Sequence, residues 1–203
     1  MIIDLINESP SRVYHTMIQT LIPRPVAWVL SENENMSLNL APFSYFSAVS
    51  SDPPLIMLSI GKKPNGDLKD TRLNIIEREK FVVHIAHREL AQSVTNSAAG
   101  FDKGQSEVEE LGLATTRFGD FLLPRLQDCR VAYACEKYRV EDITSNQAMI
   151  LGLVKAIYVN DEIILPSEND KLKLDPKKLD AIGRLGGDDY GYLGQVEEIT
   201  RPK

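Results

Sequence analysis

The sequence predicts a mainly β protein with flanking helices, organised as one domain over residues 1–203. Strand-like apolar runs recur along the chain, bounded by Pro, Gly, Asn and Asp, and only short helical patterns separate them. Two long runs, 129–140 and 148–159, are joined by the polar turn 141–146 and indicate an antiparallel hairpin. Strands interrupted by a few short helices favour a closed or sandwiched sheet over a doubly wound fold.

The composition is typical of a soluble globular protein. The chain has 203 residues, 43% hydrophobic and 26% charged, and can bury a sizeable core. Its net charge of -6 argues against nucleic acid as a partner, because nucleic-acid binding uses a broad basic surface. The start MIIDLINESP does not resemble a secretory signal, and no run approaches the roughly 18 apolar residues of a membrane helix. We therefore expect a cytoplasmic protein without a membrane partner.

The two cysteines are expected to be reduced and structural. Cys129 and Cys135 are six residues apart in a run that otherwise resembles a strand, where even spacing predicts one shared face. Neither a nearby His nor a CxxC spacing supports a metal site or a redox pair.

The N-terminal part is expected to begin with a short helix or an edge strand over residues 1–20. Pro23 and Pro25 then hold Arg24 in extended geometry, and a buried strand follows over 26–30. An isolated Arg is usually solvated, but one fixed between two prolines loses less entropy when it binds an anion. Both interpretations of Arg24 remain open at this point.

The segment 39–49 combines strand and site features. After the polar turn 31–37, Asn39 to Pro42 is extended, and Pro42 cannot donate to a sheet, which predicts an edge or a bulge. A bulge would leave backbone groups free to bind a planar heteroaromatic ring. Phe43 and Phe46 then form either an aromatic wall or part of the core. Another strand follows over 55–60.

A helix is predicted from about Lys69 to Arg78, with Asp70 as its N-cap. Its free N–H groups, the Lys69 ammonium and the Thr71 hydroxyl are the groups that hold a phosphate. The alternative is an ordinary capped helix with solvated charges.

The rest of the chain offers weaker signals. His84 lies in a predicted strand, 81–86, where a lone histidine is more often structural than catalytic, and a second helix is expected over 89–96. The acidic run at 107–110 is expected to form a solvent-exposed face. The spacing of the histidines disfavours a metal site. Gly186-Gly187 permits a tight turn from which Arg184 and Tyr190 could project together. No GxGxxG or GxxxxGK[ST] motif is present.

Several segments in order carry a family resemblance. They are PRPVAWV from Pro23, NLAPFSYF from Asn39, DPP from Asp52, KDT from Lys69, NI from Asn74 and GRLGG from Gly183. Together they resemble the flavin reductase-like family, whose fold is the FMN-binding split barrel, over about residues 20–195. Two positions depart from the family pattern: Met36-Ser37-Leu38 stand where a glycine often precedes the Asn-Leu-Ala-Pro segment, and His84 stands where Asn is common.

The resemblance implies a six-stranded antiparallel split barrel with flanking helices, and a homodimer with one FMN per subunit near the interface. FAD is the alternative flavin. The segment from Asn39 to Ser44 would lie along the flavin ring and the Lys-Asp-Thr segment near the phosphate. The cofactor-binding residues implied are Arg24, Ser31, Asn39, Ala41, Pro42, Phe43, Ser44, Lys69, Asp70, Thr71 and Arg184.

The leading hypothesis is an FMN-dependent oxidoreductase of flavin reductase type. NAD(P)H would pass hydride to the flavin, and electrons would then pass to free flavin, oxygen, or a partner oxygenase or redox protein. No side-chain acid, base or nucleophile is required. The alternatives are a flavoredoxin-type electron-transfer flavoprotein with little NAD(P)H oxidase activity, and a non-enzymatic ligand-binding barrel.

Overall fold

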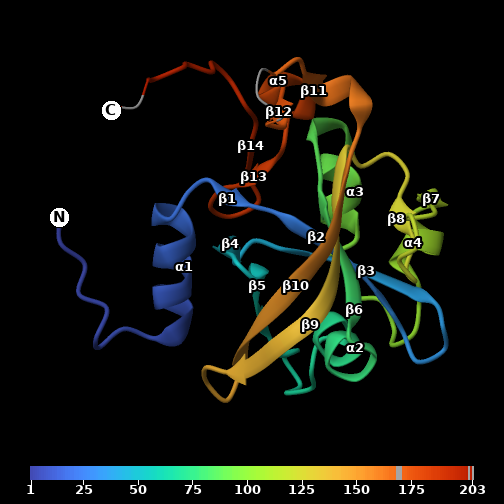
Figure 1. Ribbon diagram of the computed structural model, residues 1–203. Helices are drawn as coiled ribbons and strands as arrows, with labels where there is room; N and C mark the ends of the chain where they lie inside the picture. The colour runs from blue at the N-terminus through green and yellow to red at the C-terminus, as the bar shows by residue number, and fades with distance from the viewer. Residues whose placement is uncertain (168–170, 201, 203) are drawn as a thin grey trace.

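The fold of the computed structural model is mainly β with flanking helices, as the sequence predicts (Figure 1). The structure describes residues 1–167, 171–200 and 202. The first half contains α1 (Pro10–Thr20), β1 (Arg24–Pro25), β2 (Ala27–Glu32), β3 (Leu38–Phe43), β4 (Phe46–Ser51), β5 (Pro54–Gly61), α2 (Asp70–Arg78), β6 (Lys80–Ile85), η1 (Arg88–Leu90) and α3 (Ala91–Asn96). The second half contains α4 (Glu107–Glu110), β7 (Thr115–Thr116), β8 (Arg125–Leu126), β9 (Val131–Asp142), β10 (Gln147–Val159), η2 (Asp161–Ile163), β11 (Ile164–Leu165), β12 (Lys173–Leu174), α5 (Pro176–Leu179), β13 (Gly183–Arg184) and β14 (Tyr190–Gly191).

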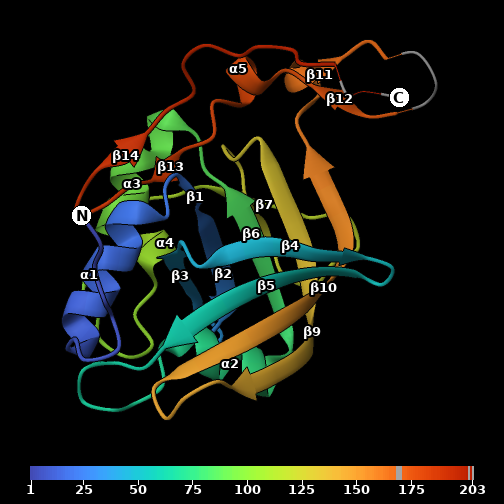
Figure 2. The same cartoon turned by 90° about the vertical axis from the view of Figure 1, so that its left-hand side faces the viewer.

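The main sheet has seven antiparallel strands in the order β3-β2-β6-β9-β10-β5-β4. β3 and β4 lie at opposite edges of this order, although only Ser44 and Tyr45 separate them in the chain. Phe43 and Phe46, which end and begin these strands, are three residues apart and lie at most about 11 Å from each other, so the sheet must bend until its edges approach there. Figure 2 shows β4 and β5 crossing in front of the other strands. The strand pairs of the described residues do not close a complete barrel.

The expected count of six strands is therefore wrong for the main sheet. The chain from 38 to 51 forms two strands, because β3 pairs with β2 whereas β4 pairs with β5. The Tyr45 carbonyl accepts a hydrogen bond from Ser59 N at 2.9 Å at the corner between them. The predicted hairpin is present as β9 and β10, and it forms the longest pairing of the sheet.

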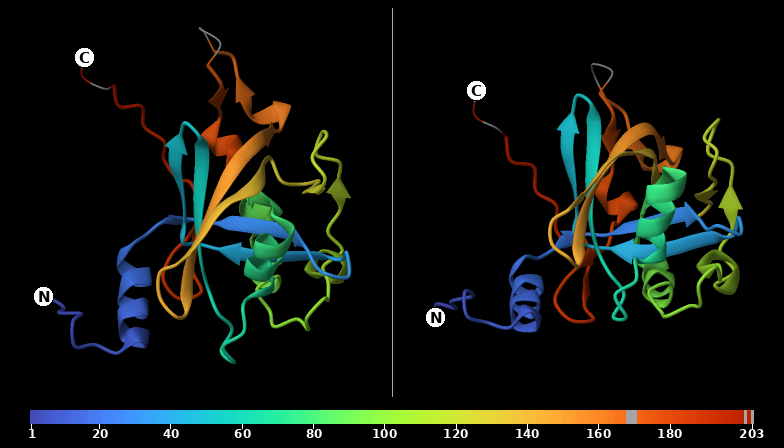
Figure 3. Two further views of the ribbon diagram at one scale, coloured as in Figure 1. Left: turned by 60° about the horizontal axis from the view of Figure 1, so that its bottom comes forward. Right: turned by 90° about the horizontal axis from the view of Figure 1, so that it is seen from below.

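The two faces of the sheet bury separate hydrophobic clusters. Trp28 and Leu30 belong to the cluster beneath α3 and α4, while Val29 lies in the cluster with Leu58 and Ile75 of α2. This alternation follows from the period of two along a strand. The packing of helices against the sheet can be followed from below in Figure 3.

The cysteines are buried and unpaired, but they do not share a face as expected. Cys129 precedes β9 and packs in the first cluster, while Cys135 lies within β9 and packs in the second. The irregular chain before β9 removes the strand period on which the expectation depended. Burial raises the pKa of Cys129 to about 12 and also raises the pKa of Cys135, so both remain thiols at neutral pH.

His84 is a structural residue, in agreement with the more probable interpretation of the sequence. Its ring is fully buried, with Nδ1 3.0 Å from the Trp28 carbonyl and Nε2 2.9 Å from the backbone nitrogen of Leu126. Because the Leu126 N–H donates to Nε2, Nδ1 must carry the proton and donate to Trp28. Burial lowers the pKa of His84 to about 4, so the ring is neutral near pH 7.

Helix α1 leaves an apolar surface exposed. Ser9 caps it by accepting from Arg12 N at 3.3 Å, and Pro10 occupies its first turn. Ile18 is buried, whereas Tyr14, Met17 and Leu21 are exposed. Figure 1 shows α1 standing beside the sheet rather than across it. No helix in the described residues is long and apolar enough to cross a membrane.

Candidate functional site

A cavity of about 500 Å³ lies between β3, the turn before α2, the first turn of α2 and the segment after α3. Its volume is within the 300–1,000 Å³ common for small-molecule sites. Seven of the residues predicted for the site line it: Asn39, Ala41, Pro42, Phe43, Lys69, Asp70 and Thr71. Segments about 30 residues apart in the sequence are thus brought together as expected.

One wall of this cavity is the free edge of β3. The strand pairs with β2 without a register break, from Ala27 opposite Phe43 to Glu32 opposite Leu38. Of the two alternatives predicted for Pro42, the edge is confirmed and the bulge is wrong. Two side chains at the start of α4 bind the backbone at the outer edge of β3. The Leu38 carbonyl accepts from Ser106 Oγ at 2.7 Å, and the Leu40 N–H donates to Glu107 Oε2 at 2.8 Å.

Pro42 fits this edge geometry. Alternate residues of a strand direct their backbone groups to the same side, so Pro42 faces the same edge as Leu40. Its missing N–H falls where no neighbouring strand requires a donor, which is where a sheet tolerates proline. The edge position, rather than a bulge, leaves the backbone accessible.

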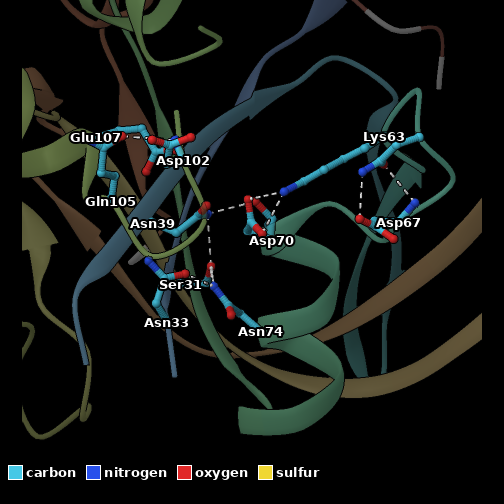
Figure 4. A network of polar contacts seen from close by, with 12 residues as sticks. Ser31, Asn33, Asn39, Lys63, Asp67, Asp70, Asn74, Asp102, Gln105 and Glu107 are labelled. Atoms are coloured by element: carbon cyan, nitrogen blue, oxygen red, sulfur yellow. Dashed lines mark hydrogen bonds and ion pairs between the residues drawn. The ribbon is translucent and has the colours of Figure 1, made fainter. Parts of the chain in front are cut away.

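A buried polar network connects this wall to α2 (Figure 4). Asn39 Nδ2 donates to Thr71 Oγ1 at 2.9 Å and to Ser31 Oγ at 3.2 Å. Asn74 Nδ2 donates to the same Ser31 oxygen at 3.1 Å and to Asn33 Oδ1 at 2.9 Å. These five side chains are buried, so each bond is protected from competing water. Ser31 does not line the cavity, and it fixes the orientation of Asn39 from behind.

The start of α2 is open toward the cavity. Lys69, not Asp70, is the N-cap, and no side chain of the described chain caps the helix. The predicted cap is wrong because the Asp70 carboxylate lies in the first turn and is bound by Lys63 Nζ at 2.8 and 3.0 Å. The first backbone N–H groups of the helix therefore remain available to a ligand.

Lys69 and Thr71 flank these N–H groups. Lys69 Nζ lies 5.7 Å from the centre of the Phe43 ring, and the described residues provide it with no ion-pair partner. Much of the side chain is open to solvent, but the cavity wall desolvates its ammonium and lowers its pKa. Thr71 Oγ1 accepts from Asn39 and keeps its own hydrogen for another acceptor.

Sequence reasoning missed Glu107. The expected solvated face applies to Glu109 and Glu110, which are exposed, but Glu107 is 7% exposed and lines the cavity. Burial raises the pKa of its carboxyl group. Its contact with Leu40 spans 67 residues, and no local spacing distinguishes it from the other acids of the run.

Arg24 lies outside the cavity and connects three parts of the chain. Its Nη1 donates to the Ile18 and Leu21 carbonyls at 2.7 and 2.6 Å, and its Nη2 donates to the Leu185 carbonyl at 2.8 Å. Its Nε donates to Ser44 Oγ at 3.3 Å. These contacts give Arg24 a structural role at the end of α1.

Ser44 and Arg184 line a neighbouring cavity of about 310 Å³, which shares Pro42 and Phe43 with the first. The sequence-predicted residues thus divide into a main group at the larger cavity, a second group beside it, and the two supporting residues Ser31 and Arg24. No group of three metal-ligating side chains occurs among the described residues.

Comparison with known proteins finds solved structures of the same fold. The chain is 30% identical to a 2-nitrobenzoate 2-nitroreductase, NbaA, of Pseudomonas fluorescens, with a TM-score of 0.89 over 100% of this chain and 96% of that one. It is 29% identical to nitrilotriacetate monooxygenase component B of Bacillus cereus, with a TM-score of 0.88 and 98% of both chains covered. The flavoredoxin of Desulfovibrio vulgaris (Miyazaki F) is 18% identical and shares the fold, with a TM-score of 0.76 over 98% of this chain and 97% of that one.

The family itself follows from the extent of the sequence match. The flavin reductase like domain matches residues 19–169, which include β1 to β10 and both sides of the larger cavity. The β3 edge, the KDT segment at α2 and the strand order of the sheet all lie within this range. With most of its sheet and its main cavity inside the matched region, the chain belongs to the flavin reductase-like family.

Proposed function

We propose that the chain binds FMN in the larger cavity and acts as a flavin reductase-type oxidoreductase that takes electrons from NAD(P)H. The observation that carries the proposal is the uncapped start of α2 beside Lys69 and Thr71. A helix N-terminus with free N–H groups, a cation and a hydroxyl is a favourable site for a phosphate. The family supplies the expectation of a flavin.

The residues present fit this cofactor. The backbone N–H groups of the first turn, the Lys69 ammonium and the Thr71 hydroxyl would bind the phosphate. Pro42 and Phe43 would provide an apolar surface for the ring, and the β3 edge would provide backbone partners. When bound, the flavin supplies the hydride and electron-transfer chemistry. The Asn39 and Ser31 network would keep this wall rigid, which lowers the entropy lost on binding.

FAD is the alternative flavin. A polar cavity of about 420 Å³ adjoins the first one at Asp70 and is bordered by Asn33, Asn74 and Lys103. This cavity offers space for a larger group beyond the phosphate site. Titrations with FMN and FAD in parallel decide between the two, and tighter binding of FMN is expected.

The proposal includes a cytoplasmic homodimer. The exposed apolar residues Tyr14, Met17 and Leu21 lie on one side of α1, and a second copy would remove them from water. A partner oxygenase fits the likeness to a monooxygenase component, and free flavin, oxygen or a redox protein are the other acceptors. Sedimentation of the purified protein tests the dimer.

Two alternatives remain within the fold. A flavoredoxin-type carrier would hold flavin tightly and consume little NAD(P)H, and a non-enzymatic barrel would bind another ligand or none. Consumption of NADH and NADPH, measured with and without added free FMN, separates the reductase from the carrier. Failure to take up FMN in a fluorescence titration would contradict both of the flavin proposals.

A further inference from the structure

The smaller cavity lies next to the proposed flavin cavity but has a different character. It is formed where the β3–β4 corner meets the C-terminal loop, and Pro42 and Phe43 contribute to both cavities. Its polar side carries Ser44, Arg184, Asp188 and Tyr190. An apolar wall opposite a few polar groups is the usual composition of a small-molecule site.

Arg184 has donors available for a ligand. Its Nη2 donates to the Gly187 carbonyl at 2.6 Å, and its guanidinium lies 4.8 Å from the centre of the Tyr190 ring. The other guanidinium nitrogens have no partner within the described part of the chain. The side chain is 26% exposed, so it is held in place yet accessible. A planar guanidinium in this state is suited to a carboxylate.

The charged residues that line this cavity are Arg184 and Asp188, and the buried Arg24 lies next to it. Arg24 lies directly opposite Arg184 across the β1–β13 pair and is 5% exposed. Its hydrogen-bond partners are three carbonyls and the Ser44 hydroxyl, and no carboxylate of the described residues pairs with it. Asp188 lies 3.8 Å from Arg184, but its side chain is fully exposed, so solvent screens this pair. Two guanidinium charges therefore outweigh one screened carboxylate.

The geometry points to a binding site for a planar, single-ring organic anion in this smaller cavity. Arg184 binds the carboxylate of the anion, and Ser44, whose oxygen accepts from Arg24, donates its hydrogen to the same group. The ring of the anion lies against the parts of Pro42 and Phe43 that face this smaller cavity, while the proposed flavin ring uses the parts that face the larger one. A volume of about 310 Å³ suits a single ring. Its use as the site of a second substrate beside the flavin rests on the proposed function, whereas the binding itself does not.

The test uses benzoate as the probe and the full chain, both without flavin and with FMN bound. Isothermal titration should show benzoate binding at least tenfold tighter than benzamide, which has the same ring without the charge. Arg184→Met should weaken benzoate binding at least tenfold, while Arg139→Met, the same change at an exposed arginine on β9, should leave it unchanged. Equal binding of benzoate and benzamide, or benzoate binding that survives Arg184→Met, would overturn the site.

A second variant changes an exposed side chain and tests the effect of negative charge beside Arg184 on benzoate binding. Asp188→Asn removes the fully exposed carboxylate beside Arg184, so benzoate binding should be retained or tighten by up to about threefold, and benzamide binding should not change. A weaker affinity for benzoate in this variant would contradict the proposal. The FMN affinity measured in parallel keeps the two proposals separate. Loss of FMN binding in Arg184→Met with benzoate binding retained would assign Arg184 to the flavin, whereas a wild-type chain that binds benzoate but no FMN would refute the flavin proposal alone.

Discussion

Replacement of Thr71 by valine removes one hydroxyl with little change in shape and tests the proposed phosphate site. Thr71 is 1% exposed, and its oxygen accepts from Asn39 Nδ2 at 2.9 Å. A hydrogen bond to a charged group contributes about 1.5 to 3 kcal/mol. Loss of such a bond to the phosphate should therefore weaken FMN binding roughly 10- to 150-fold, at about 1.4 kcal/mol per tenfold.

The assay compares FMN with riboflavin, which has the same ring system without the phosphate. Fluorescence titration of the wild-type, Thr71→Val and Thr71→Ser chains gives the affinity for each ligand. The valine variant should lose affinity for FMN and keep its affinity for riboflavin, and the serine variant should retain most FMN binding because it retains the hydroxyl. Thr115→Val, the same change at an exposed position of β7, is the matched control.

Two results would contradict the assignment of Thr71 to the phosphate. An unchanged FMN affinity in the double variant Lys69→Ala and Thr71→Ala would show that neither side chain binds the phosphate. An equal loss for FMN and riboflavin in Thr71→Val would show that the substitution acts through the cavity wall. The second outcome has a physical route, because Asn39 loses a buried acceptor and such a loss costs about 1 to 3 kcal/mol. The free energy of unfolding should therefore be measured for each variant.

The remaining predictions concern stability and the thiols. The pKa of His84 is lowered from 6.5 to about 4 in the folded chain, so the unfolded chain binds the proton more readily. The free energy of unfolding should therefore fall by about 3 kcal/mol as the pH falls from 6.5 through 4. Urea unfolding across this pH range should show this fall in the wild-type chain and not in His84→Gln. Glu107→Ala leaves the Leu40 N–H without its acceptor and should lower the free energy of unfolding by about 1 to 3 kcal/mol. Glu107→Gln should lower it less, because its amide oxygen can still accept this hydrogen bond. Thermal unfolding of the two variants measures the difference. Cys129→Ser and Cys135→Ser should leave the rate of flavin reduction intact, since both thiols are buried and protonated, and a large loss of rate would implicate a thiol.

The strands were predictable because their signals are local. Val26 to Leu30, Leu55 to Ile60 and Phe81 to Ala86 are short apolar runs between turn residues, and each overlaps a strand of the structure. The division of 38–51 into two strands was not predictable, because it depends on which edge of the sheet each half joins. Pairing across the sheet is a long-range property that local patterns do not contain.

The candidate site was likewise predictable only where its signals are local in the sequence. The place of Lys69 and Thr71 at the start of α2 was predictable, because a helix start has a recognisable local chemistry. Asp70 was wrongly predicted as the N-cap, because its partner Lys63 lies in the preceding turn. Glu107 was missed for a similar reason, because its role depends on contact with β3. Arg184 was found as a residue able to project from a glycine turn, and the structure places it in the smaller cavity.

The absorption spectrum of the purified protein, recorded anaerobically before and after addition of NADH or NADPH, shows both whether the chain binds a flavin and whether a nicotinamide reduces it. We expect that the protein carries or takes up FMN, and that at least one nicotinamide bleaches the oxidised flavin bands. Bound flavin that dithionite reduces and neither nicotinamide reduces would contradict the reductase and favour the carrier. A colourless protein that takes up no FMN would contradict the flavin site at α2 altogether.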